Sequence, residues 1–193
     1  MLTTCQFNST GAGFIGPVVP QWQAAAKAPP SPAELSAAAR LLVEGSVTAP
    51  DIGIYPDDLL EVDPENFGIV GFPTWLWAKN PGPGFTAPLV QTTTVQGHTL
   101  RVQARFNYSH WDLGDGTAIT CDLGTEAVNV DRPLRSPSGC DHIYERKDTY
   151  TITATWYLSV EWDGAGRSGW FEVTVDRQGT YRVGEVHVVA VKP

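Results

Sequence analysis

Two stretches of alternating apolar and polar residues constrain the fold of this chain more than any other feature. Between residues 100 and 108, and again between residues 152 and 162, every second side chain is apolar. Because successive side chains of a β-strand point to opposite faces of a sheet, this period predicts two strands with one buried and one solvated face. The apolar positions are Leu100, Val102, Ala104, Phe106 and Tyr108 in the first stretch, and Ile152, Ala154, Trp156, Leu158, Val160 and Trp162 in the second.

Glycine-containing turns divide the rest of the C-terminal half into further strands. We expect a tight turn at Gly97–His98 and a second one at residues 163–166. A third turn is expected at Gln178–Gly179, followed by a last strand from residue 181 to residue 191. Strands of this kind over about 110 residues predict a mainly β protein, with an antiparallel sandwich over residues 85–193.

The N-terminal part, residues 1–84, is expected to be an arm laid against the sandwich. Ser31, Pro32 and Glu34 have the spacing of a capping box, which predicts a helix over about residues 32–44. An acidic loop is expected at residues 46–66, and a Trp-rich edge strand at about residues 68–77. Residues 1–30 have neither helical nor strand periodicity, so extended chain is expected there.

The six residues from Trp111 to Gly116, Trp-Asp-Leu-Gly-Asp-Gly, follow the first alternating stretch directly. The Trp is expected to fill the space between the sheets, and the two glycines permit positive φ in a tight turn. The two aspartates can accept backbone N–H groups and hold that turn. The expected structural residues are Trp111, Asp112, Gly114, Asp115, Gly116, His142 and Tyr144.

The same aspartates allow a second interpretation. Asp112 and Asp115 could bind calcium together with Asp141 or Glu126, because calcium prefers carboxylate oxygens. The sequence favours capping of the turn over a metal site, and we expect no cofactor.

The cysteines bear on where the protein works. Cys121 and Cys140 flank an irregular loop within a β region, where exported proteins place a disulfide, although two free thiols are the alternative. Cys5 is left without an expected partner. The first residues have neither a charged nor an apolar leader segment, so we expect a secreted or cell-surface protein whose export signal is absent from this sequence.

Composition narrows the classes of partner. The net charge is −8, and the basic residues form no polybasic run, which disfavours nucleic acid and anionic membranes as partners. No apolar run approaches the roughly 18 residues of a membrane span. The four histidines form no His-x-x-x-His pair and no Gly-x-Ser-x-Gly elbow is present, so we expect a protein without enzymatic activity.

Exposed aromatic rings could bind a partner or a sugar. Trp156 and Trp162 share the apolar face of their strand and are expected in the core. Tyr157 and Trp170 fall on outward faces, whereas Trp75 and Trp77 could instead seal the junction with the N-terminal segment. The candidate binding surface consists of Tyr157, Trp170, Trp75 and Trp77.

The motif at residues 111–116, the later His142-Ile143-Tyr144 and the strand that begins at Tyr150 resemble the signature of PKD domains. Leu113 stands where that signature usually has Phe, and the cysteine loop enlarges the segment between the two motifs. The resemblance covers about residues 85–193. It implies an immunoglobulin-like sandwich that works outside the cell.

A narrower resemblance is to secreted PKD-containing proteins of actinobacteria. It rests on residues 73–77, the cysteine pair, residues 159–162, the turn 164–166 and residues 182–186. From both resemblances we expect an interaction or structural module that contacts another protein in an exported assembly or in adhesion. The alternative is a carbohydrate-binding module that uses exposed aromatic rings on a polysaccharide.

Overall fold

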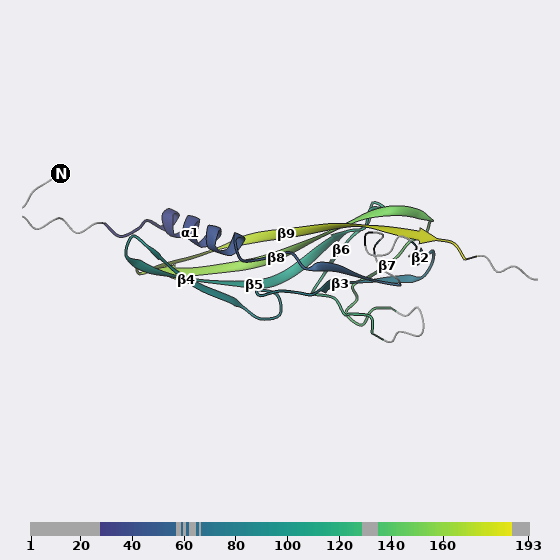
Figure 1. Cartoon of the computed structure of the whole chain (residues 1–193), viewed down its shortest axis with the longest axis horizontal. Coiled ribbons are helices and arrows are strands. Elements are labelled where there is room, and N and C mark those ends of the chain that lie inside the picture. Colours follow the sequence, from purple (N-terminus) through teal and green to yellow (C-terminus); the bar gives the residue numbers. More distant parts are fainter. Residues whose placement is uncertain are drawn as a thin grey trace, which may run out of the picture.

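The computed structural model describes residues 28–56, 59, 61, 65, 67–128 and 135–186. In this part the protein is mainly β, with two sheets and one short helix, as expected. Figure 1 shows an elongated molecule in which long strands run along most of its length. The helix lies beside one end of these strands, and the smaller sheet lies toward the other end.

The larger sheet has the order β2-β9-β8-β5-β4, and β6 pairs with β5 beyond this path. Its strands are antiparallel apart from the short parallel pair of β2 with β9. The bounds are β2 Gly68–Ile69, β4 Leu89–Val95, β5 His98–Asp112, β6 Ala118–Cys121, β8 Asp148–Gly164 and β9 Arg167–Gly184.

The smaller sheet has the order β1-β3-β7, with β1 at Asp51–Tyr55, β3 at Pro73–Lys79 and β7 at Asp141–Ile143. Two sequence expectations were wrong here. Part of the supposed acidic loop is strand β1, because Ile52 and Ile54 are buried against the core. The expected edge strand at 68–77 is two strands in different sheets, and β3 is central, because β1 and β7 flank it.

Helix α1 (Pro32–Glu44) has the predicted bounds and the predicted capping box. Oγ of Ser31 accepts the N–H of Glu34, and the Glu34 carboxylate accepts the N–H of Ser31. The buried residues Leu35, Ala39 and Val43 recur at the spacing of one helix face. That face covers part of the larger sheet, since α1 contacts β9, β5 and β8.

One hydrophobic core joins the N-terminal and C-terminal parts. Leu35 and Leu76, from the expected arm, belong to the same buried cluster as Leu100 and Trp156. The expected boundary near residue 84 therefore passes through a shared core and does not separate an arm from an independent sandwich.

A β-bulge changes which face of β5 is buried. The register between β5 and β8 shifts between Phe106 and Tyr108. Leu100, Val102 and Ala104 are buried as predicted, but after the shift the odd-numbered residues point inward. Tyr108 was therefore assigned to the wrong face: it is half-buried on the outer side and stacks on Tyr157, with ring centroids 4.4 Å apart.

The expected turn at Gln178–Gly179 does not exist. Strand β9 continues from Arg167 to Gly184 and pairs with β8 throughout. Gly179 is buried, and a Cβ at this position would collide with the side chain of Leu59. The glycine therefore allows close packing and does not mark a turn.

Several expectations lie outside the described residues. These are the arm before residue 28, including Cys5, and the end of the chain after residue 186. No helix in the described part of the chain has the length and apolar character needed to cross a membrane.

We predict that the helix contributes to the stability of the whole fold. Leu35→Ala should lower the free energy of unfolding by about 2–5 kcal/mol, because Leu35 is 0% exposed within the shared core. Leu41→Ala is the matched control: Leu41 is 73% exposed, so the change should stay within about 0.5 kcal/mol. Urea unfolding measures both, and equal effects would contradict the shared core.

Candidate binding surface

The Trp-Asp-Leu-Gly-Asp-Gly segment forms the turn between β5 and β6, and its aspartates hold the backbone. Oδ1 of Asp112 accepts the N–H of Gly114 at 3.0 Å, and Oδ1 of Asp115 accepts the N–H of Thr117 at 2.9 Å. Trp111 is 0% exposed and packs edge-to-face on Trp156. We call this turn, together with His142 and Tyr144, the motif corner.

The motif corner links the two sheets. His142, on β7 of the smaller sheet, donates from Nε2 to Oδ2 of Asp115 at 2.7 Å. The hydroxyl of Tyr144 donates to the carbonyl of Leu113 at 3.1 Å. Burial, with Asp115 nearby, raises the pKa of Tyr144 well above its usual range, so the phenol stays a neutral donor.

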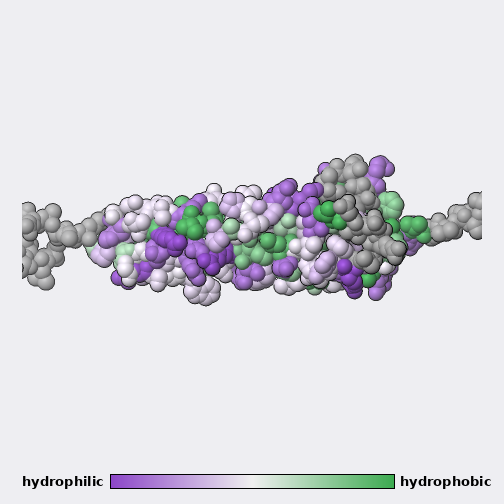
Figure 2. Space-filling view, turned by 90° about the horizontal axis from the view of Figure 1, so that it is seen from below, coloured by the Kyte–Doolittle hydropathy of each residue, from purple (hydrophilic) through white to green (hydrophobic). Residues whose placement is uncertain are grey.

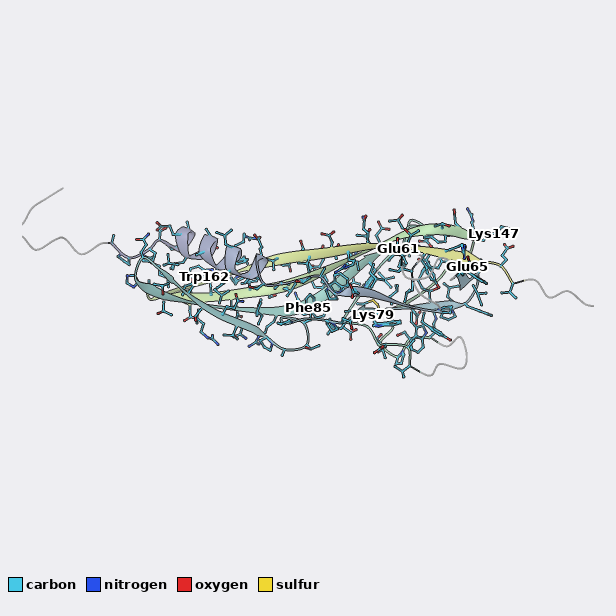
Figure 3. The ribbon with its side chains drawn as sticks, in the orientation of Figure 1. Glu61, Glu65, Lys79, Phe85, Lys147 and Trp162 are labelled. Carbon is cyan, nitrogen blue, oxygen red and sulfur yellow. A yellow bond between two sulfur atoms is a disulfide. The ribbon has the colours of Figure 1, made fainter. Side chains whose placement is uncertain are left out.

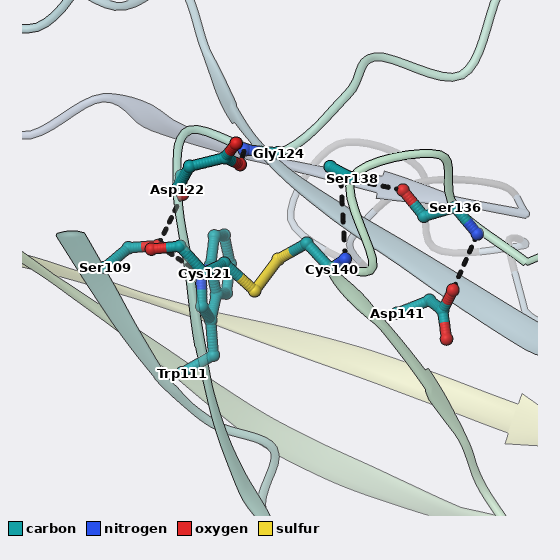
Figure 4. The surroundings of a disulfide bond; sticks show 9 residues. All are labelled: Ser109, Trp111, Cys121, Asp122, Gly124, Ser136, Ser138, Cys140 and Asp141. Atoms are coloured by element: carbon teal, nitrogen blue, oxygen red, sulfur yellow. Dashed lines mark hydrogen bonds between the residues drawn. A yellow bond between two sulfur atoms is a disulfide. The ribbon is translucent and has the colours of Figure 1, made fainter.

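The disulfide provides a further link at the same end of the molecule. Cys121 at the end of β6 is bonded to Cys140 just before β7, as Figure 4 shows. Beside it, the Trp111 indole donates to Oγ of Ser109, and Ser109 donates to the carbonyl of Asp122. These contacts tie the cysteine loop to the inner face of the larger sheet.

Three of the four carboxylates considered for calcium are engaged elsewhere. Asp112 and Asp115 hold the turn, while Asp141 accepts the N–H of Ser136 and pairs with Arg135. Within the described residues, no group of three His, Cys, Asp or Glu side chains has a metal-binding arrangement. The geometry accounts for both motif aspartates as turn caps.

Of the four aromatic residues in the predicted binding surface, two are in the interior. Trp75 and Trp77 are 6% and 8% exposed. Trp75 packs on Tyr55, and the Trp77 ring lies over Gly53 of the neighbouring strand. Because buried rings cannot stack on a ligand, Trp75 and Trp77 were wrongly included in that surface and serve as core residues instead.

The other two lie on the face of the larger sheet that no helix or second sheet of the described residues covers, which we call the outer face. Trp156 and Trp162 point to the opposite, inner face, as predicted, and Trp162 lies at the end of the sheet that carries α1 (Figure 3). On the outer face Trp170 is 76% exposed, while Tyr157 is half-buried by its stack on Tyr108.

A shallow depression of about 400 Å³ lies on the outer face beside Trp170. The register places Trp170 of β9 opposite Glu161 of β8, and Glu161 opposite Gln103 of β5. One row further along, Arg101 lies opposite Asp163, and their side chains form an exposed ion pair at 4.0 Å. The depression therefore combines a flat aromatic ring with polar groups of both charges. Its lining residues are Arg101, Gln103, Glu161, Trp162, Asp163, Ser168, Gly169 and Trp170.

The polar part of this depression was missed from the sequence. Arg101 and Gln103 belong to β5, and about sixty residues separate them from Glu161 and Asp163 of β8. Only the register between the strands brings these side chains together. The alternation of residues 100–108 marked Arg101 and Gln103 as outward-facing but did not indicate their neighbours.

Comparisons of the chain with models of protein families, with curated proteins and with solved structures found no match.

We predict that the two glycines of the motif corner differ in their tolerance of a side chain. Both have positive φ, 79° at Gly114 and 88° at Gly116, so alanine should cost about 1–2 kcal/mol at either position. A Cβ at Gly114 would also lie 2.6 Å from the carbonyl oxygen of Thr151, whereas at Gly116 it meets nothing within 4 Å. Urea unfolding should show Gly114→Ala as the more destabilising by about 1–3 kcal/mol.

We also predict that the link between Asp115 and His142 weakens in acid. Partial burial would raise the pKa of Asp115, but hydrogen bonds from Thr117 and His142 outweigh burial and lower it. A lowered pKa in the folded state stabilises the fold above the unfolded value of about 3.9, and this contribution is lost as the pH falls through the folded value.

Asp115→Asn should therefore lower the free energy of unfolding by about 1.5–3 kcal/mol at pH 7. The difference from the unsubstituted protein should shrink below about pH 4, where the carboxyl of the unfolded chain is protonated first and that of the folded protein at lower pH. Chemical unfolding at pH 7, 5, 4 and 3 measures this difference. A difference that stayed constant down to pH 3 would exclude a stabilising role for the charged form.

Proposed function

We propose that this chain is a non-enzymatic interaction module of the PKD type, which works outside the cell and binds another protein through its outer face. The observation that carries the proposal is the asymmetry of the larger sheet. Its inner face is covered by α1 and the smaller sheet, while Trp170 on the outer face is 76% exposed.

The chemistry of the outer face supports a protein partner. Trp and Arg are the residues that most often dominate the binding energy of protein interfaces, and here Trp170 and Arg101 flank one depression. The Tyr108–Tyr157 stack adds a second flat aromatic surface further along the strands. Exposed polar neighbours such as Glu161 and Asp163 fit the polar rim of such an interface.

Two features support the PKD type and the location. The motif corner joins the residues that carry the PKD resemblance, since Asp115 bonds His142 and Tyr144 bonds the turn. The disulfide between Cys121 and Cys140 supports an oxidising compartment, where such bonds form and persist.

A polysaccharide is the second candidate ligand, and the depression favours it. Sugars stack on exposed aromatic rings and hydrogen-bond to planar polar groups beside them. Trp170 provides such a ring, and Arg101, Gln103 and Glu161 provide donors and acceptors around it.

We predict that Trp170→Ala abolishes binding of the partner protein. The full chain, immobilised and exposed to the secreted and cell-wall fractions of the source organism, should retain a protein that Trp170→Ala fails to retain. A central Trp typically contributes at least 2 kcal/mol, so binding should weaken by about 30-fold or more. Leu41→Ala is the matched control, because Leu41 on α1 is equally exposed at 73%.

The same three proteins should be tested on an array of polysaccharides. Binding to a glycan that Trp170→Ala abolishes and Leu41→Ala preserves would replace the protein partner with a sugar. Retention of the same proteins by all three chains, with no glycan bound, would refute the outer face as the binding surface.

A further inference from the structure

The two edges of the larger sheet differ in how they are protected. Strand β4 forms one edge, and within the described residues it pairs only with β5. Strand β9 forms the other edge along most of its length, because β2 pairs with it at only two residues. Unpaired edge strands expose backbone N–H and C=O groups that can pair with a further strand.

The hairpin between β4 and β5 determines which backbone N–H and C=O groups of β4 point away from β5. Gln96 and Gly97, with φ of 52° and 86°, form a two-residue turn flanked by the pair Val95 and His98. In such a hairpin the flanking pair exchanges hydrogen bonds, and bonded and non-bonded pairs then alternate. The backbone groups that point away from β5 are therefore those of Val90, Thr92 and Thr94.

The edge of β9 is protected. The same alternation, counted from the turn at Ala165–Gly166, directs the backbone groups of Thr180 away from β8. The N–H of Thr180 donates a hydrogen bond to the carboxylate of Glu61 at 2.9 Å. Figure 3 places Glu61 at this edge. Glu172 and Asp176 are also outward-pointing positions of β9, and their negative charges oppose pairing with a second acidic chain.

Among the residues that the structure describes, none gives the edge of β4 such a protection. Its sequence, Leu-Val-Gln-Thr-Thr-Thr-Val, contains no charge, no proline and no bulge, in a chain whose net charge is −8. Val90, Thr92 and Thr94, whose backbone groups point away from β5, are also exposed to solvent. Figure 2 shows that on one side of the molecule apolar groups form separate patches among polar ones.

We propose that β4 pairs with β4 of a second copy of this chain, antiparallel and about a twofold axis at Thr92. In this register Thr92 lies opposite Thr92 of the second copy, and Val90 lies opposite Thr94 of the second copy. The free N–H and C=O groups of all three residues then find partners. On the inner side, Leu89 lies opposite Val95 of the second copy, which extends the apolar layer.

The strand is self-complementary in this register, which is why a second copy fits it. In a twofold-symmetric pairing, each residue of β4 lies opposite one defined residue of β4 in the second copy. No residue of β4 is charged, so no pair contains a charge. The same operation on β9, about Thr174, would place Glu172 beside Asp176 of the other copy. The paired sheets would form one continuous surface with both Trp170 side chains on the same side, so the dimer would double the outer face.

Sedimentation velocity of the full chain over a range of concentrations tests the proposal. The apparent mass should rise from one chain toward two. Thr92→Pro and Thr92→Lys should remain monomeric, because one removes the central N–H and the other places two positive charges together. Thr174→Lys is the matched control on β9 and should still form dimers. Thermal unfolding shows that each variant is folded.

Cross-linking tests the register. With Cys5→Ser as background, Thr92→Cys should form a disulfide-linked dimer, since the paired Cα atoms would be about 5.5 Å apart, within reach of a disulfide. Thr174→Cys should not. A chain that stays monomeric at all concentrations, or a dimer that survives Thr92→Lys, would overturn the proposal. Neither result bears on binding through Trp170, because Trp170 lies on β9, at the other edge of the sheet.

Discussion

The inner face of strand β8 must be kept from water along its whole length, and the rest of the structure depends on this requirement. The inward residues from Tyr150 to Trp162 are all buried, a stretch of about 40 Å at the rise of a β-strand. A helix of 13 residues covers about 20 Å. Strand β3, with seven residues, spans about 23 Å. Neither element suffices alone, so the helix and the smaller sheet divide the length between them.

That division explains why so many linkages gather at one end. The helix is a single continuous element that its capping box and buried face hold in place. The smaller sheet is assembled from segments far apart in the sequence, and its strand β7 has only three residues. Such a short strand cannot hold its position by pairing alone. The Asp115–His142 and Tyr144–Leu113 bonds fix the region around β7 to the β5–β6 turn, and the disulfide fixes it to the end of β6.

The features that depend on residues a few positions apart were predicted from the sequence. The prediction was wrong where one extra residue changes the register between two strands. The capping box of α1, the apolar face of β8 and the turn role of the motif aspartates follow from spacing over a few residues. The bulge near Asn107 is different. One extra residue reverses the faces of β5, and this turns Trp111 inward although the alternation that starts at Leu100 would place it outside.

Gly179 and Trp77 show a second reason for failure. A glycine before a strand pattern indicates a turn, but at residue 179 the absent side chain makes room for Leu59 from a distant segment. Trp77 was included in a possible binding surface as one of a set of aromatic rings that could lie exposed. It is buried because β1 and the cysteine loop both pack on β3, through Gly53 and through the Ala78–Leu123 hydrogen bond. Both depend on contacts between segments that the local pattern does not encode.

Under the proposed function, the residues that hold the fold and the residues that bind the partner are separate. The motif corner contains residues whose contacts hold the fold, so a change there reduces stability. Trp170 contributes little to packing, since most of its surface is in water and its cross-strand neighbour is the exposed Glu161. Replacement of a largely exposed side chain usually changes the folding free energy by no more than about 0.5 kcal/mol. Under the same proposal, residues of the outer face can change without cost to the core, while the cross-linked end keeps the sheet in place.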